Sequence, residues 1–200
     1  MGRIRDNDAP PADLPAAGYY SASGNQIIDA NGDAVRLKAI NWFGMEGYLG
    51  VPDGLYTRNW QDMMEQMQGL GFDSIRLPFS LQNVLPGAMP NNIVYEINPD
   101  LRGLTNLQVM DKVVEYAGEL GMKIILDCHR STSGAGPNEN GLWYDGNFSE
   151  AQWISTWQSL AQRYDGNSTV IGMALQNEPH GAPGTDWSAA AERAGNAVHA

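Results

Sequence analysis

Apolar residues fall into two patterns that alternate from residue 35 to the end of the sequence. Short, nearly continuous apolar runs predict buried strands, and they cover residues 35–44, 72–80, 122–130 and 169–179. After each run, apolar residues recur at every third or fourth position. This spacing predicts amphipathic helices, and these start near residues 60, 105, 149 and 186. Strands and helices that alternate in this way are typical of a parallel sheet covered by helices.

Local signals support the starts of two of these helices and one turn. Thr105 with Gln108, and Ser149 with Gln152, have the Ser/Thr-x-x-Gln spacing of a capping box. In this motif each side chain satisfies a backbone N–H group that the first helical turn leaves unpaired. An Asn-Gly pair at 31–32 stands between two short β-prone runs and predicts a β-hairpin ahead of the first parallel strand.

Two architectures fit this order of elements, a doubly wound open sheet and a (β/α)8 barrel. The first strand-to-helix turn lacks Gly-x-Gly-x-x-Gly, and there is no P-loop, so a nucleotide-binding open sheet has little support. Polar residues gather where the predicted strands end, and in a barrel these ends share the face that holds the active site. A complete barrel needs about 250 residues. We therefore expect residues 18–200 to be the amino-terminal half of a (β/α)8 TIM barrel, after a flexible Pro- and Ala-rich segment at 1–17.

Composition narrows the range of partners. The chain carries 12 basic and 23 acidic residues, a net charge of −11, which argues against nucleic acid or an anionic membrane surface as partner. Cys128 is the single cysteine, so no intramolecular disulfide is possible, and no set of Cys and His residues has metal-ligand spacing. No apolar stretch approaches the roughly 20 residues that span a bilayer, and no signal peptide is visible. The sequence thus predicts neither a metal nor a cofactor.

The last apolar strand ends in the unusual sequence Asn-Glu-Pro at residues 177–179. Because proline disfavours a helical conformation in the residue before it, Glu178 is expected to be extended at the end of the strand. A partly buried carboxyl at this end of a barrel suits a general acid. The alternative is a glutamate in a solvated turn.

Five further residues stand out near the strand ends, and each has a structural alternative to a functional role. Arg76 lies inside an apolar strand and needs an anionic partner, either in a structural ion pair or to orient a catalytic carboxylate. His129 could donate to a substrate hydroxyl or be satisfied by local hydrogen bonds, and Cys128 is expected to pack. Trp42 and Trp143 could stack on the apolar face of a sugar or belong to the core.

Several segments together resemble glycoside hydrolase family 5, and most closely its bacterial endo-1,4-β-glucanases, or cellulases. They are "INWFG", "IRLPFS", "LQVMDKVVEYAGELGMKIILDCHR", "LAQRYDGNSTVIGMALQNEPHG" and "AAERAGNAV". The resemblance runs in order over residues 18–200, and it implies a (β/α)8 barrel that hydrolyses a β-glycosidic bond with retention of configuration. An Asn-Glu-Pro motif alone is weakly specific, but its position after the Ile-Arg-Leu-Pro and Leu-Asp-x-His strands is highly specific.

The same resemblance implies roles for individual residues. Glu178 matches the general acid/base, which protonates the leaving oxygen and later deprotonates the incoming water. Asn177 matches the residue that binds the sugar 2-hydroxyl, a contact that strengthens in the transition state. Arg76 matches an arginine that pairs with the nucleophilic carboxylate, and His129 matches a histidine that binds the same sugar. Trp42 lies in the matching first-strand segment and is taken as a further substrate-binding residue.

One departure from the family pattern matters for activity. The family's nucleophile is a second glutamate on the seventh strand, and residues 1–200 contain no such segment. Retaining hydrolysis needs two carboxyl groups about 5–5.5 Å apart, so these residues are predicted to be inactive alone. The full-length protein is expected to be an extracellular monomer that acts on β-glucan without cofactor or metal. A mannanase or other β-glycanase, and a non-catalytic carbohydrate-binding half-barrel, remain as alternatives.

Overall fold

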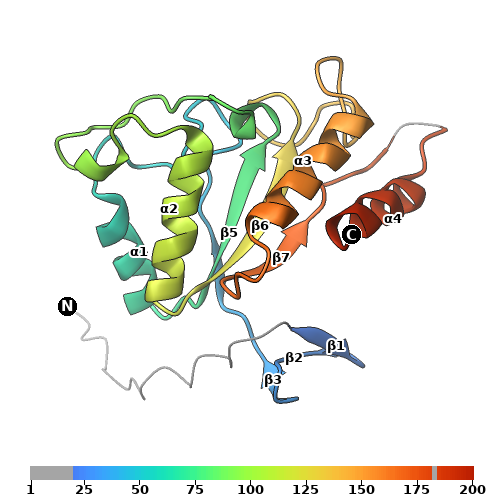
Figure 1. The fold of residues 1–200 in the computed structure, drawn as a ribbon, viewed down its shortest axis with the longest axis horizontal. Helices are drawn as coiled ribbons and strands as arrows, with labels where there is room; N and C mark the ends of the chain where they lie inside the picture. Colours follow the sequence, from blue (N-terminus) through green and yellow to red (C-terminus); the bar gives the residue numbers. More distant parts are fainter. Residues whose placement is uncertain (1–19, 182–183) are drawn as a thin grey trace, which may run out of the picture.

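A computed structural model of the chain describes residues 20–181 and 184–200; the predicted lead-in at 1–17 lies outside them. Four parallel strands form one sheet in the order β4-β5-β6-β7, which is also their order in the sequence. Their bounds are Ala39–Asn41, Ser74–Ser80, Lys123–Arg130 and Val170–Ala174. The strands point toward the same edge of the sheet (Figure 1), so the predicted β-then-α units and parallel sheet are confirmed.

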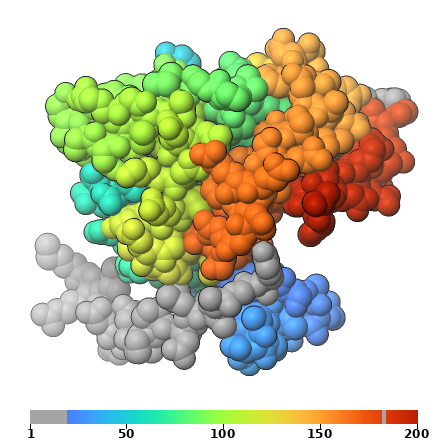
Figure 2. Space-filling view, in the orientation of Figure 1, coloured from blue at the N-terminus to red at the C-terminus, as the bar shows by residue number. Residues whose placement is uncertain are grey.

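A small antiparallel sheet precedes the parallel one. Its strands are β1 (Ser21–Ser23), β2 (Gln26–Ile28) and β3 (Ala34–Val35), and β2 pairs with both of the others. The hairpin predicted around residues 31–32 is therefore confirmed as β2–β3. The sequence did not predict β1, because Ser-Ala-Ser has neither apolar alternation nor β-branched residues. The small sheet lies at the end of the molecule opposite the loops that follow the parallel strands (Figures 1 and 2).

Each parallel strand is followed by a helix, and the helices begin where their caps predict. The four helices are α1 (Trp60–Gly69), α2 (Asn106–Glu119), α3 (Glu150–Arg163) and α4 (Trp187–Val198). Both predicted capping boxes are present, since Thr105 accepts from the N–H of Gln108 and Ser149 accepts from the N–H of Gln152. Two short 3-10 helices, η1 (Gln82–Val84) and η2 (Pro99–Leu101), lie in the long segment between β5 and α2.

The two outer strands of the parallel sheet are shorter than predicted. β4 has three residues in place of the run 35–44, and β7 ends at Ala174 although the apolar run continues. β4 is also not buried, since Ala39 and Asn41 are exposed. Both strands lie at an edge of the sheet and have one neighbour each among the described residues. Apolar sequence alone does not extend a strand that lacks a ladder on its second side.

The central strands present different residues to the two faces of the sheet. Alternate side chains of β5 and β6 are fully buried, and Phe79 packs edge-on against Trp157 of α3 with ring centroids 5.4 Å apart. Burial of an aromatic side chain of this kind stabilises the fold by about 1.5–3 kcal/mol. Because successive side chains of a strand point to opposite faces, Arg76, Asp127 and His129 share the face that the helices do not cover.

Candidate active site

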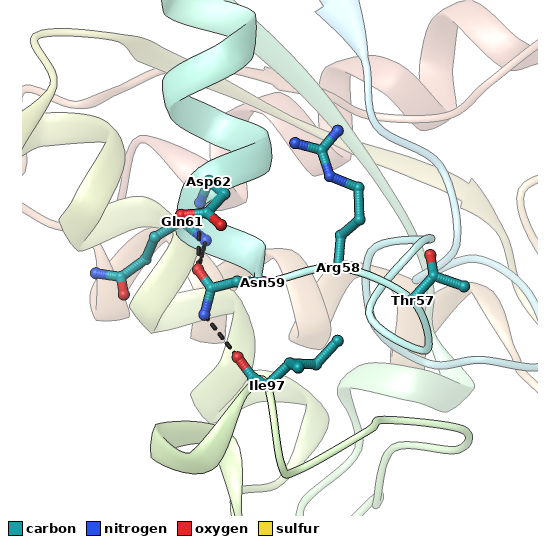
Figure 3. A pocket seen from close by; sticks show the side chains of 6 residues that line it. All are labelled: Thr57, Arg58, Asn59, Gln61, Asp62 and Ile97. Atoms are coloured by element: carbon teal, nitrogen blue, oxygen red, sulfur yellow. Dashed lines mark hydrogen bonds between the residues drawn. The ribbon is translucent and has the colours of Figure 1, made fainter.

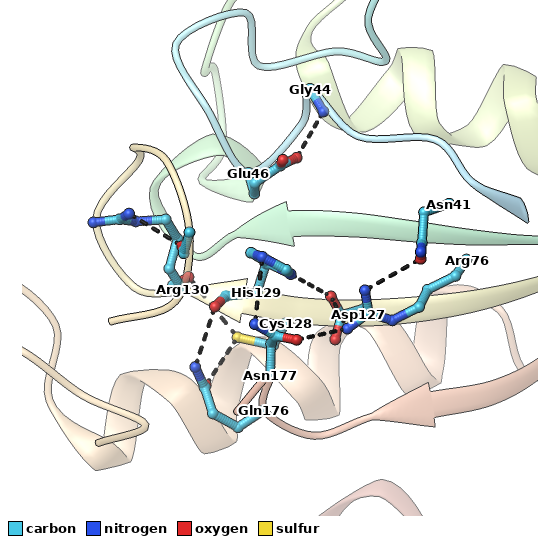
Figure 4. A network of polar contacts seen from close by, with 11 residues as sticks. Asn41, Gly44, Glu46, Arg76, Asp127, Cys128, His129, Arg130, Gln176 and Asn177 are labelled. Atoms are coloured by element: carbon cyan, nitrogen blue, oxygen red, sulfur yellow. Dashed lines mark hydrogen bonds and ion pairs between the residues drawn. The ribbon is translucent and has the colours of Figure 1, made fainter. Parts of the chain in front are cut away.

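Arg76 of β5 gathers polar groups from three other segments at the carboxyl ends of the strands (Figure 4). Its guanidinium lies 2.9 Å from Asp127 Oδ2 of β6, in an ion pair whose carboxylate side chain is fully buried. The same terminal nitrogen donates to Asn177 Oδ1 at 2.9 Å, and the other donates to Asn41 Oδ1 of β4 at 3.2 Å. Arg76 therefore has the anionic partner that its apolar strand predicts, and among the described residues that partner is Asp127.

His129 closes this group of residues into a ring. Its Nδ1 lies 2.8 Å from Asp127 Oδ2, and its Nε2 lies 3.4 Å from Asn177 Nδ2. A carboxylate only accepts hydrogen bonds, so Nδ1 carries the proton and donates it. Asn177 presents its amide nitrogen to His129, because its oxygen already accepts from Arg76. The four side chains thus form a closed hydrogen-bonded ring, which we call the polar ring.

Glu178 follows the polar ring directly, in a bend beyond the end of β7. Its φ angle is 46°, in the left-handed region. The prediction that Pro179 holds Glu178 extended is therefore wrong. A non-glycine residue in this region costs about 1–3 kcal/mol, and such strain persists only where surrounding contacts enforce it. The side chain is exposed, where the sequence predicted partial burial. The bend turns the chain away from β7, which has a neighbouring strand on one side only among the described residues.

The two loop tryptophans are buried. Trp42 is 3% exposed and donates from Nε1 to the backbone carbonyl of Asp53 at 2.9 Å. Trp143 is also 3% exposed and donates to Glu150 Oε2 of α3 at 2.9 Å. Neither presents a free ring face in the described residues, so the core alternative holds for Trp143, and the substrate-stacking role expected of Trp42 is not supported.

Exposed aromatic residues occur instead elsewhere in the segment between β4 and α1. Phe43 is 58% exposed, Tyr48 is 77% exposed and Tyr56 is 39% exposed. One sign of an exposed ring was available in the sequence, because Trp42 and Phe43 are adjacent and successive side chains of an extended chain point to opposite sides. The sequence therefore predicts that one of these two side chains faces solvent, but it does not show which one.

Cys128 lies beside the polar ring but on the other face of β6. It is fully buried, as predicted for a packing residue. Burial raises the pKa of its thiol, and the negative charge of Asp127 raises it further. The reactive thiolate is therefore scarce as well as inaccessible.

We predict that Cys128 in the native protein reacts with dithionitrobenzoate only as fast as the protein unfolds. Labelling located by peptide mass should be slow without denaturant and immediate in concentrated urea. Rapid labelling of Cys128 in the native protein would contradict the burial described here.

A surface hollow of about 630 Å³ lies away from the polar ring, at the start of α1 (Figure 3). Asn59 caps α1 there, accepting from the N–H groups of Gln61 and Asp62, and its amide donates to the carbonyl of Ile97. The side-chain oxygen and amide of Asn59 are therefore both used in holding the start of α1 and the segment at Ile97 together. The polar groups of Asn59 have a structural role as a helix cap, and they do not indicate a ligand site in the hollow.

Among residues 20–181 and 184–200, no three His, Cys, Asp or Glu side chains are grouped so that they could hold a metal ion. In the same part of the chain, no helix is long and apolar enough to cross a membrane.

Polar side chains converging at the carboxyl ends of parallel strands define the active-site end of an α/β barrel enzyme. The profile of the family described as cellulase (glycosyl hydrolase family 5) matches residues 28–200. The chain therefore belongs to glycoside hydrolase family 5.

Two curated relatives are each 45% identical to the chain. An endoglucanase of Paenibacillus polymyxa matches over 188 residues, which are 90% of this chain and 47% of the relative. The major extracellular endoglucanase of Xanthomonas campestris pv. campestris matches over 191 residues, 92% of this chain and 39% of the relative. The chain thus spans about half the length of the curated relatives it matches, or less.

Solved structures give the same picture of the fold. The endocellulase of Pyrococcus horikoshii in complex with cellotetraose is 39% identical, with a TM-score of 0.82, and the match covers 92% of this chain and 55% of that one. The catalytic domain of the Xanthomonas campestris pv. campestris endoglucanase is 43% identical, also with a TM-score of 0.82, and the match covers 90% and 53% of the two chains. The (β/α)8 fold class is confirmed, with the hairpin and four βα units seen here matching about half of these structures.

Sequence reasoning named three of the four residues in the polar ring. Arg76, His129 and Asn177 come together as a site in the structure, while Asp127 was not among the predicted site residues. The signal for Asp127 was present, because a residue two positions before His129 on a strand shares its face. Asp127 is the anion nearest to both Arg76 and His129, and it therefore decides the geometry of the ring.

Proposed function

We propose that the full-length protein is a retaining glycoside hydrolase that cleaves internal β-1,4-glucosidic bonds of cellulose or related β-glucans. The observation that carries the proposal is the polar ring, placed beside Glu178 at the carboxyl ends of the strands. It is supported by 45% identity to two endoglucanases and by likeness to an endocellulase that binds cellotetraose. The name of the Xanthomonas relative also supports an extracellular location.

In this proposal Glu178 is the general acid/base. Its carboxyl donates a proton to the oxygen of the leaving sugar while a second carboxylate attacks the anomeric carbon from the other side. The resulting glycosyl-enzyme is then hydrolysed by a water that Glu178 deprotonates. The second carboxylate comes from outside residues 1–200, so these residues alone do not complete the reaction.

The polar ring orients the sugar on which this chemistry occurs. Asn177 Nδ2 has two hydrogens, of which one faces His129, and the other is available to the sugar 2-hydroxyl. Arg76 holds the amide in this orientation by donating to its oxygen. Hydrogen bonds to the 2-hydroxyl strengthen in the transition state and contribute several kcal/mol. His129 contacts the same sugar from β6.

The substrate is tested by product release from soluble polysaccharides. We expect the full-length protein to release reducing ends from carboxymethylcellulose much faster than from mannan, with a rapid fall in viscosity because internal bonds are cut. Faster release from mannan would replace the glucanase proposal with a mannanase. Binding of either polysaccharide without release would indicate a non-catalytic carbohydrate-binding protein.

A further inference from the structure

The strained backbone of Glu178 requires a contact that holds it. A side chain disfavours the left-handed region by contact between its Cβ and the backbone, and the ring of Pro179 restricts the preceding residue further. Glu178 nevertheless has a φ of 46°. Strain of this kind is found where neighbouring structure enforces a geometry needed for function.

Two hydrogen bonds close the chain around Glu178. His180 Nδ1 lies 3.0 Å from the carbonyl oxygen of Glu178 and, since a carbonyl only accepts, Nδ1 is the donor. One residue further on, the N–H of Gly181 donates to the carbonyl oxygen of Gly141 at 2.8 Å. The first bond bends the chain at Glu178, and the second ties the bend to the loop between β6 and α3.

The same loop supports the ring of His180. A Cβ atom placed on Gly141 would lie 2.5 Å from both Cδ2 and Nε2 of His180, a separation that real Cβ atoms do not adopt. The ring therefore lies against the bare backbone of Gly141. Gly141 is anchored in turn, since its N–H donates to the carbonyl of Asn138 at 2.9 Å, and Asn138 is buried against the end of β6.

We propose that His180 and Gly141 together position Glu178. His180 is the positioning residue, and Gly141, which has no side chain, leaves the space that the ring of His180 occupies. The inference rests on the proposed role of Glu178 as general acid/base. A side chain at residue 141 displaces the ring of His180, the bond to the carbonyl of Glu178 is lost, and the carboxyl moves away from the glycosidic oxygen. A displacement of about 1 Å can lower a catalytic rate about a hundredfold.

The test compares two glycines of the same loop in the full-length protein. Gly141 and Gly136 have φ angles of +68° and +69°, so Gly141→Ala and Gly136→Ala introduce the same backbone strain. A Cβ at Gly136 meets nothing within 4 Å, whereas one at Gly141 meets His180. Urea unfolding of both variants measures the strain, and kinetics measure the effect on Glu178.

The diagnostic readout is the dependence of kcat/KM on the leaving group. On a cello-oligosaccharide, whose leaving oxygen must be protonated, we expect Gly141→Ala to lower kcat/KM about ten- to a hundredfold relative to Gly136→Ala. On 2,4-dinitrophenyl β-cellobioside, whose leaving group needs no proton, the two variants should agree. Equal values on the oligosaccharide, or equal losses on both substrates, would overturn the inference. Equal losses would instead indicate that His180 binds the sugar directly.

Variants of His180 provide a second test if Gly141→Ala does not fold. The side chain of His180 is exposed, so its replacement should leave the fold intact. His180→Phe keeps a ring but loses the donor, and it should show the same leaving-group dependence. His180→Gln keeps an N–H donor and should retain more activity than His180→Phe. A Gln variant no better than the Phe variant would contradict the proposed hydrogen bond.

Glu178→Gln is measured beside these variants to separate the two proposals. If Glu178→Gln keeps the wild-type rate on the oligosaccharide, the role proposed for Glu178 fails, and the positioning role fails with it. If Glu178→Gln is inactive while Gly141→Ala matches Gly136→Ala, only the positioning role fails.

Discussion

Glu178→Gln should lower kcat/KM on cello-oligosaccharides by about 10²–10⁴, the range that a general acid contributes. The amide has nearly the shape of the carboxylic acid but cannot release a proton to the leaving oxygen. On 2,4-dinitrophenyl β-cellobioside the first step needs no acid, so kcat/KM should remain close to the wild-type value. Initial rates on the two substrates measure the difference directly.

Glu139→Gln is the matched control for this prediction. Glu139 is also an exposed glutamate near the loops that follow the strands, and the same exchange removes one carboxyl there. We expect unchanged rates on both substrates for Glu139→Gln. Loss of activity in both glutamine variants would indicate a general effect of charge. A wild-type rate of Glu178→Gln on the oligosaccharide would exclude Glu178 as the general acid.

A second consequence concerns added nucleophiles. With the dinitrophenyl substrate, Glu178→Gln should accumulate the glycosyl-enzyme, because no base activates the water that hydrolyses it. Azide needs no base and should restore turnover by forming the glycosyl azide. Rescue by azide would thus support the role of Glu178 as base, and the loss of activity on cello-oligosaccharides tests its role as acid.

Elements with local causes were the ones that the sequence predicted well. The starts of α2 and α3 depend on Thr105 with Gln108 and on Ser149 with Gln152, residues three positions apart. The face of β5 and β6 that packs against helices follows from alternation along each strand. Such features need no knowledge of distant segments.

Features that depend on distant contacts were predicted poorly. The burial of Trp42 depends on the carbonyl of Asp53 and on the segment that covers it. The left-handed backbone of Glu178 lies in a bend that the N–H of Gly181 joins to the carbonyl of Gly141, more than thirty positions away in the sequence. Proline biases the conformation of its neighbour by local sterics, and we infer that the contacts of His180 and Gly181 outweigh that bias.

Asp127→Ala should lower the free energy of unfolding by about 3 kcal/mol, as expected when one partner of a buried ion pair is removed. The carboxylate is fully buried and Arg76 is 29% exposed, so the loss should fall at the lower end of the usual range. Removal of Asp127 also leaves His129 Nδ1 without its acceptor. Urea unfolding of the full-length protein at neutral pH measures the change.

The control is an ion pair of the opposite kind. Glu96 and Arg102 lie 3.9 Å apart with side chains that are 80% and 64% exposed, and water screens such pairs almost completely. Glu96→Ala should not change the free energy of unfolding measurably. Similar losses for Asp127→Ala and Glu96→Ala would mean that the buried pair contributes no more than a surface pair.

Asp127→Asn separates the geometry of the polar ring from its charge. Asp127 Oδ2 accepts from both Arg76 and His129 Nδ1. In Asp127→Asn the amide oxygen should take this position, because an NH2 group there would face the guanidinium of Arg76, which only donates. His129 then keeps its proton on Nδ1 and the polar ring stays closed, while the negative charge opposite Arg76 is lost. We therefore expect Asp127→Asn to lower the free energy of unfolding less than Asp127→Ala and to leave the Nδ1–H tautomer unchanged. The ¹⁵N shifts of the His129 imidazole and urea unfolding measure these two effects, and a proton on Nε2 would refute the role of this oxygen in orienting the ring.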